Sequence, residues 1–188
     1  MKAICIIGSP NPKGSTATIV DKIIEGMSIN NIEIKRYVLG EMNINYCKGC
    51  KVCYKAKKCI QNDDMEVVIK DLCESDIVVI ASPSYWGDVT GQLKVFFDRS
   101  TPLCDTNGGT EVPKGKIGIS VAVRTGQRVE ENMHLIEAIE HYYGHLGIKP
   151  VARYTVEGVQ YREDFEVKWD KVEEAYKLGA DILGSLQP

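Results

Sequence analysis

The sequence has no excess of positive charge and no long hydrophobic run. Its 188 residues include 23 Lys and Arg against 26 Asp and Glu, which gives a formal net charge of −3. This balance removes the bulk electrostatic argument for nucleic-acid binding. No apolar run approaches the ~20 residues of a membrane-spanning helix, and the first residues read as a strand rather than a cleavable leader. We therefore expect a cytoplasmic protein that binds neither nucleic acid nor membrane.

Two nucleotide-binding motifs are also missing. The absence of G-x-x-x-x-G-K-[ST] excludes a Walker ATPase, and the absence of G-x-G-x-x-G removes the dinucleotide fingerprint. There is no internal repeat or low-complexity linker, and 44% of the residues are hydrophobic, which is enough for one domain to bury a core. We expect a single domain over residues 1–188, with a cysteine-rich loop insertion at residues 45–62.

Cysteines are the distinctive feature of that insertion. Cys47, Cys50, Cys53 and Cys59 follow the spacing C-x2-C-x2-C-x5-C. The short gaps curl the backbone around one side of a cubic metal centre, and the longer gap lets the fourth thiolate reach the far side, so the spacing predicts a [4Fe-4S] cluster. Structural zinc and a loop that binds no metal remain as alternatives. We expect no ligand role for the other cysteines, Cys5, Cys73 and Cys104.

A phosphate-binding pattern opens the chain. The apolar run at residues 2–8 leads through a Gly/Ser/Pro loop to a helix pattern that begins at Ser15. Hydroxyls and free amides at a helix start hold an anion, which the helix dipole also favours. A single phosphate held in this way fits FMN, although an ordinary capped turn is the alternative. The residues predicted for this site are Ser9, Ser15, Thr16 and Ala17.

Two later loops complete the predicted flavin site. Each follows a buried strand pattern, the first at residues 76–81 and the second at residues 116–123. An isoalloxazine ring is a wide apolar plate with polar edges, so aromatic faces and backbone amides suit it. The alternative role of the aromatic pair in the first loop, Tyr85 and Trp86, is to cover the core. The residues predicted to contact FMN are Pro83, Ser84, Tyr85, Trp86, Gly87, Arg124, Thr125 and Gly126.

Strand and helix patterns alternate along the whole chain. The strand patterns lie at residues 2–8, 32–38, 76–81, 116–123 and 148–156, and the last helix pattern at residues 164–186. This alternation predicts an α/β fold, a flavodoxin-like doubly wound parallel sheet in the order 2-1-3-4-5, in which the loops after strands one, three and four meet at the switch point. Asp63 and Glu66 predict a capping box at a helix start. His134, His141 and His145 are interpreted as surface or interface residues.

Together these residues resemble the flavodoxin-like iron–sulfur flavoproteins, a branch of the NAD(P)H-dependent FMN reductase superfamily. The resemblance covers about residues 1 to 127. It implies FMN near a subunit interface, a [4Fe-4S] cluster on the four cysteines, and a homo-oligomer, either a dimer or a tetramer. Sister flavoproteins carry similar cysteine loops without a cluster. The matching motifs are Gly8-Ser9-Pro10, Gly14-Ser15-Thr16, the four cysteines before Asp63-Asp64-Met65, Pro83-Ser84-Tyr85-Trp86-Gly87 and Leu93-Lys94-Phe96-Asp98-Arg99.

The leading hypothesis is an FMN-dependent oxidoreductase that passes electrons between a reduced carrier, a ferredoxin-like protein or NAD(P)H, and an acceptor through FMN and a [4Fe-4S] cluster. No side chain is expected to act as a catalytic acid or base, because the redox chemistry belongs to the cofactors. Two alternatives remain: an NAD(P)H-dependent FMN or quinone reductase without a cluster, and a non-catalytic flavin- or zinc-binding regulatory protein. Lysines in the cysteine loop favour docking of an acidic donor, and a solvated charged loop is the alternative; they are Lys48, Lys51, Lys55, Lys57 and Lys58.

Overall fold

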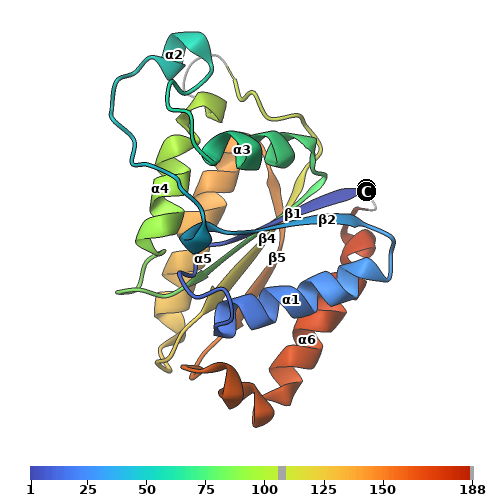
Figure 1. The fold of residues 1–188 in the computed structure, drawn as a ribbon. Coiled ribbons are helices and arrows are strands. Elements are labelled where there is room, and N and C mark those ends of the chain that lie inside the picture. The colour runs from blue at the N-terminus through green and yellow to red at the C-terminus, as the bar shows by residue number, and fades with distance from the viewer. Residues whose placement is uncertain (106–108, 187–188) are drawn as a thin grey trace.

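A five-stranded parallel sheet in the order β2-β1-β3-β4-β5 forms the centre of the computed structural model, which describes residues 1–105 and 109–186 (Figure 1). The predicted α/β class and strand order are confirmed. The predicted domain also includes residues 106–108 and 187–188, which lie outside the described residues. The strands are β1 (Lys2–Ile7), β2 (Glu33–Val38), β3 (Ile77–Pro83), β4 (Ile117–Val123) and β5 (Lys149–Val156).

Helices cover both faces of this sheet (Figure 1). One face packs against α1 and α6, and the other packs against α3, α4 and α5. In the described part of the chain, no helix is long and apolar enough to cross a membrane. The α-helices are α1 (Ser15–Ser28), α2 (Cys53–Ala56), α3 (Met65–Glu74), α4 (Gly91–Arg99), α5 (Val129–Leu146) and α6 (Trp169–Ala180). The short 3-10 helices are η1 (Leu39–Glu41), η2 (Thr101–Leu103), η4 (Arg162–Glu166) and η5 (Ile182–Leu186).

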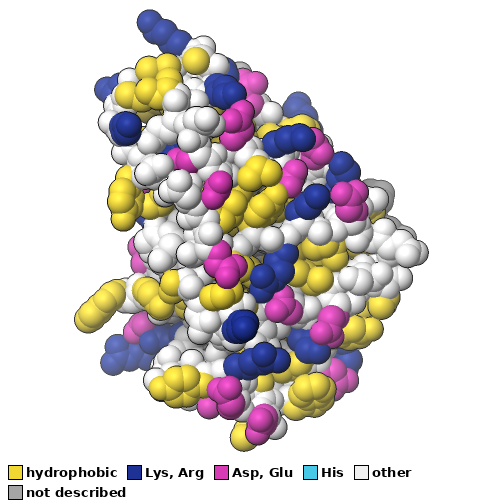
Figure 2. Space-filling view, viewed as in Figure 1, with side chains coloured by type: hydrophobic (Ala, Val, Ile, Leu, Met, Phe, Trp, Pro, Cys, Tyr) yellow, Lys and Arg dark blue, Asp and Glu magenta, His cyan; other side chains and the backbone are white. Residues whose placement is uncertain are grey.

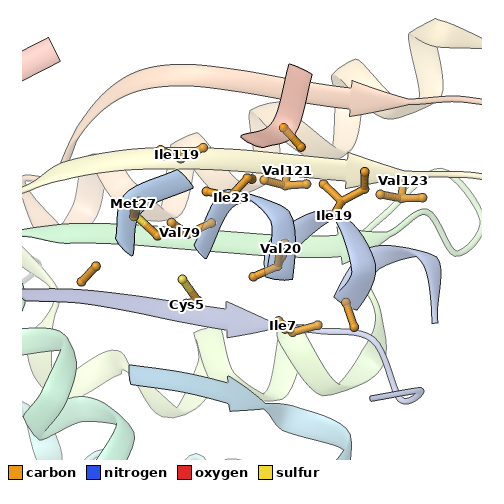
Figure 3. Packing of buried hydrophobic residues seen from close by; sticks show 14 of the residues in the cluster. Cys5, Ile7, Ile19, Val20, Ile23, Met27, Val79, Ile119, Val121 and Val123 are labelled. Atoms are coloured by element: carbon orange, nitrogen blue, oxygen red, sulfur yellow. The ribbon is translucent and has the colours of Figure 1, made fainter. Parts of the chain in front are cut away.

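The apolar stripe of α1 lies directly on the sheet. Figure 3 shows Ile19, Ile23 and Met27 of this helix facing side chains from β1, β3 and β4. Cys5 of β1 is part of this layer and is fully buried. Because burial disfavours the thiolate, it raises the pKa of Cys5 to about 12. This matches the prediction that Cys5 is a core residue rather than a ligand.

Two glycines let α1 and α6 approach each other closely. A Cβ atom placed on Gly179 would lie 2.0 Å from the carbonyl oxygen of Ile23, and one on Gly26 would lie 2.1 Å from the carbonyl oxygen of Tyr176. Both contacts are with backbone atoms, which cannot rotate away as a side chain can. The contact between the helices therefore requires glycine on each side.

Gly179→Ala is expected to destabilise the protein by about 1–3 kcal/mol or more, because the added methyl group forces the two helices apart. Gly144→Ala is the matched control, since a Cβ there meets nothing within 4 Å. Alanine at that exposed helical position should raise stability by up to about 1 kcal/mol. Urea unfolding followed by circular dichroism measures both changes. Equal stabilities of the two variants would contradict this account of the helix contact.

The closing helix differs from its prediction at residues 164–186. The chain forms η4, α6 and η5 there instead of one continuous helix. Lys168 leaves helical geometry, with φ −102° and ψ 45°, and its ammonium group donates to the carbonyl oxygen of Glu157 at 2.5 Å. Asp164 accepts hydrogen bonds from the backbone of Gln160 and Tyr161, which fixes η4 as a separate turn. Hydrogen bonds to the segment that precedes η4 therefore override the local helix pattern.

Candidate functional site

The loop after β1 presents an anion-binding site at the start of α1. Gly14 is the N-cap of this helix and has no side chain that could cap the helix start. Ser15 is buried, and its hydroxyl oxygen has no hydrogen-bond partner among the described residues. Thr16 and Ala17 are buried beside it. A buried hydroxyl and uncapped backbone N–H groups at one helix start fit a phosphate group.

Ser9 has a different role from Ser15. Its hydroxyl accepts a hydrogen bond from the backbone N–H of Asn11 at 3.1 Å and lies 3.3 Å from the carbonyl oxygen of Asn11. This local pairing shapes the loop that carries the chain from β1 into α1. These hydrogen bonds make Ser9 a loop-forming residue, and its role as a ligand stays a prediction.

The loop after β3 projects its aromatic side chains outward. Tyr85 and Asp88 exchange backbone hydrogen bonds of 3.0 and 3.1 Å, so residues 85–88 form a tight turn. Trp86 and Gly87 occupy its centre with φ of 57° and 77°. Positive φ at both central positions is the type I′ pattern, which glycine tolerates and tryptophan adopts at a cost. Trp86 is fully exposed and Tyr85 is 50% exposed, so neither covers the core.

The loop after β4 holds its arginine side chain against the protein. Arg124 donates from Nη1 to the carbonyl oxygen of Arg128 at 2.7 Å, and its Nη2 lies 2.6 Å from Oε2 of Glu131. The backbone N–H of Gly158 donates to the carbonyl oxygen of Gly126 at 3.1 Å. These contacts fix the loop, and exposed Thr125 is the part that projects toward solvent. The guanidinium of Arg124 thus pairs with Glu131 of α5, and its role as a flavin ligand stays a prediction.

Hydrogen bonds join these three loops at the carboxyl edge of the sheet. Thr90, the N-cap of α4, donates from its hydroxyl to the carbonyl oxygen of Gly8 at 2.6 Å. Its backbone N–H donates to the hydroxyl of Ser82 at 3.2 Å, and Ser84 N–H donates to the carbonyl oxygen of Val123 at 2.8 Å. Thr90 and Ser82 are not among the predicted site residues. A threonine directly before a helix pattern is the N-cap signal that could have identified Thr90.

The four loop cysteines all line one small cavity. Gly49, Lys51 and Lys57 have φ of 62°, 59° and 51°, and these left-handed residues turn the backbone repeatedly within the loop. The four thiols form no disulfide. A cubic cluster takes one thiolate at each of four iron atoms, so it suits ligands that surround a cavity. The residues lining the cavity thus fit the predicted group.

The thiols do not converge on a single point. In the described ranges, 1–105 and 109–186, no three His, Cys, Asp or Glu side chains gather as a ligand set for one metal ion. A structural zinc site requires four ligands within about 2.3 Å of one ion. The structure therefore brings the predicted cysteines to one cavity, while metal ligation remains a prediction.

A buried ion pair anchors the cysteine loop to α4. Asp63 accepts from Arg99 at 2.7 and 3.0 Å in a bidentate arrangement, and both side chains are 1% exposed. Asp63 also accepts from the backbone N–H of Asn45 at 3.0 Å. The hydrogen bonds from Arg99 hold the pKa of the Asp63 carboxyl well below its usual range. The same pairing, with a smaller contribution from Cys59, raises the pKa of Arg99.

This ion pair corrects the predicted capping box. Helix α3 begins at Met65, and its N-cap residue is Asp64. The Asp64 side chain makes no capping hydrogen bond. Asp63 does accept from the Met65 backbone at 3.2 Å, but Glu66 pairs with Lys58 at 2.7 Å instead of returning to the helix start. Sequence reasoning could not find the ion pair because Asp63 and Arg99 lie 36 residues apart.

Asp63→Asn is expected to cost about 3–5 kcal/mol at neutral pH, because it leaves the Arg99 charge buried without a partner. The folded pKa of Asp63 is depressed, so its stabilisation is complete above the unfolded pKa of about 3.9 and is lost as the pH falls toward the folded value. The variant should lack this component of acid destabilisation. Urea unfolding between pH 7 and pH 3 measures this pH dependence of the unfolding free energy. The control is Asp98→Asn, because Asp98 forms an exposed ion pair with Lys94. Equal losses in both variants would contradict the assignment.

Two of the three histidines contribute to a cleft between α4 and α5. Nε2 of His141 lies 3.2 Å from Nε2 of His145, and Nδ1 of His145 lies 2.9 Å from Oδ1 of Asp105. The cleft encloses about 490 Å³, and the stacked rings of Phe97 and Tyr142 form its apolar wall. All three histidines are exposed, as predicted.

The chain is similar in sequence to known flavin reductases and iron-sulfur flavoproteins. The family described as NADPH-dependent FMN reductase matches residues 1–160. An iron-sulfur flavoprotein of Archaeoglobus fulgidus is 36% identical over 126 residues, or 67% of this chain and 56% of that protein. One from Methanocaldococcus jannaschii is 37% identical over 123 residues, or 65% and 62% of the two chains. The chain thus spans less than two thirds of either relative.

A third iron-sulfur flavoprotein, from Methanosarcina thermophila, is 26% identical over 192 residues and covers 100% of this chain and 97% of that protein. Among solved structures, an NAD(P)H:quinone oxidoreductase from Methanothermobacter marburgensis has a TM-score of 0.74 at 15% identity, with coverages of 97% and 96%. An FMN-dependent NADH-azoreductase from Bacillus anthracis, solved with FMN, has a TM-score of 0.73 at 12% identity, with coverages of 97% and 99%. Both solved structures share the fold of this chain.

Proposed function

Because this chain belongs to the NADPH-dependent FMN reductase family, we propose that it is a flavin-dependent oxidoreductase that binds FMN at the three joined loops and a [4Fe-4S] cluster at the cysteine cavity. The observation that carries the flavin site is the buried Ser15 hydroxyl without a partner at the uncapped start of α1. FMN exchanges two electrons or one, and a cluster exchanges one, so the pair links two-electron to one-electron chemistry.

The protein's residues have binding and positioning roles in this proposal. Ser15, Thr16 and Ala17 hold the phosphate, and the loops after β3 and β4 surround the flavin ring. The exposed faces of Tyr85 and Trp86 are available to an aromatic plate. Relatives of this chain are named iron-sulfur flavoproteins, which supports assigning the cluster to Cys47, Cys50, Cys53 and Cys59.

Donor docking is proposed at the lysine-rich end of the molecule. Figure 2 shows Lys and Arg side chains around a hydrophobic group where α2 lies in Figure 1. Lys57 pairs with Glu111 at 3.3 Å and Lys58 pairs with Glu66 at 2.7 Å, so the positive field is weaker than the sequence suggests. The remaining lysines of the loop are exposed and suit an acidic donor such as ferredoxin. NAD(P)H is the alternative donor, which the family name supports.

Assembly as a dimer or tetramer is also proposed. The exposed Trp86 and the cleft between α4 and α5 present apolar surface close to the flavin loops. Such surface is typical of a subunit contact. Light scattering coupled to gel filtration measures the assembly state directly, and a monomer at micromolar concentration would contradict the proposal.

Anaerobic purification tests the function and separates the alternatives. We expect bound FMN, iron and acid-labile sulfide in the purified protein, and reduction of the flavin absorbance by NAD(P)H or by reduced ferredoxin. FMN without iron would favour the reductase that lacks a cluster. Zinc without sulfide, together with flavin that no donor reduces, would favour a regulatory protein.

A further inference from the structure

Arg99 stands between the ion pair with Asp63 and the cysteine cavity. It ends α4 and is 2% exposed. Nη1 and Nη2 donate to Asp63 at 2.7 and 3.0 Å, and Nη1 also donates to the carbonyl oxygen of Asn45 at 2.6 Å. These hydrogen bonds fix one end of the planar guanidinium.

One nitrogen of this group has no partner. Nε of Arg99 is buried and makes no hydrogen bond among the described residues. Arg99 also lines the cavity that contains the four loop cysteines, and it lines a neighbouring cavity together with Cys59. A buried N–H donor without an acceptor is unfavourable, and an unexplained one indicates an acceptor that is in place only when the site is filled.

We propose that Arg99 is a positioning residue of the cluster site, whose Nε–H donates a hydrogen bond to a sulfur atom of the [4Fe-4S] centre or of its Cys59 thiolate. This inference rests on the cluster of the proposed function. Asp63 holds the guanidinium in place and largely compensates its charge. The contribution of Arg99 is therefore a directed N–H donor rather than added positive charge, which distinguishes it from the exposed lysines of the loop.

A hydrogen bond to sulfur has a defined consequence. It stabilises the more negative reduced form of a cluster and so raises the reduction potential. The rigid fork makes Arg99 suited to this role, because one end binds the carboxylate while Nε remains available. A lysine would retain the charge but lose both the fork and the Nε–H.

Redox titration compares two altered proteins with the parent. Arg99→Lys removes the donor, and the double variant Arg99→Gln/Asp63→Asn removes it without leaving an uncompensated buried charge. We expect a lower midpoint potential in both, with at least a tenfold loss in the equilibrium constant for one-electron reduction, or 59 mV. Lys94→Gln on the same helix is the control and should retain the parent potential. Unchanged potentials in variants with normal iron and sulfide overturn the inference.

A second measurement uses the parent protein itself. With ¹⁵N-labelled arginine, pulsed electron paramagnetic resonance of the reduced cluster should detect a ¹⁵N coupling from a nearby guanidinium, and Arg99→Lys should abolish it. The coupling in the parent protein tests the role of Arg99 even if a variant loses its cluster. A parent protein that contains the cluster but shows no ¹⁵N coupling overturns the role of Arg99 alone. A parent without iron and sulfide overturns the proposed function and this inference together.

Discussion

Replacing Cys50 with alanine is expected to remove or convert the [4Fe-4S] cluster while FMN stays bound. Three thiolates leave one iron atom without its protein ligand, so iron and sulfide should fall well below the parent values. The loop itself should remain in place, because the buried Asp63–Arg99 pair and the hydrogen bonds to Asn45 anchor it independently of the thiols. Iron and sulfide analysis, the visible spectrum and flavin content measure the outcome.

The other cysteines of the chain supply the controls. Cys73 lies partly buried against the core on the α3 side, and Cys104 lines the cleft between α4 and α5. Cys73→Ala and Cys104→Ala should retain a full complement of iron and sulfide. A Cys50→Ala protein with the parent cluster content, or a parent that contains zinc and no sulfide, would show the ligand assignment to be wrong.

Ser15→Ala is expected to weaken FMN binding and, at the same time, to stabilise the flavin-free protein. A hydrogen bond to a charged phosphate contributes about 1.5–3 kcal/mol, so its loss should raise the dissociation constant about 10- to 150-fold. The Ser15 hydroxyl is buried, and no described residue forms a hydrogen bond with it. Removing it relieves an unsatisfied polar group, and alanine favours the helix, so the unfolding free energy should rise by about 1 kcal/mol.

These opposite signs separate a binding role from a structural one. Quenching of FMN fluorescence gives the dissociation constant, and urea unfolding of the flavin-free protein gives the stability. Ser28→Ala at the other end of α1 is the matched control, because its exposed hydroxyl donates to the carbonyl oxygen of Ile24 at 2.8 Å, far from the loop. Parent affinity in Ser15→Ala, or FAD as the sole bound flavin, would contradict the phosphate site.

Local patterns in the sequence were sufficient for the fold class and the strand order. Buried parallel strands appear as continuous apolar runs, so β1, β3 and β4 were identifiable one at a time. The alternation of strands and helices then restricted the sheet order, because crossovers between parallel strands are right-handed. The positions of the loops after these strands, side by side at the carboxyl edge of the sheet, follow from that order alone. Predicting where a flavin would bind therefore needed no side-chain contact between distant residues.

The tertiary structure decided how the predicted residues are used. Arg124 turns back onto Glu131, Trp86 projects from a tight turn, and Asp63 pairs with Arg99 rather than with a helix start. Each outcome depends on a contact between separate elements or on a backbone turn, and periodicity encodes neither. The close approach of α1 and α6 at their glycines is a further case. Periodicity reports which face of an element is buried, whereas hydrogen-bond partners become defined only when the elements pack together.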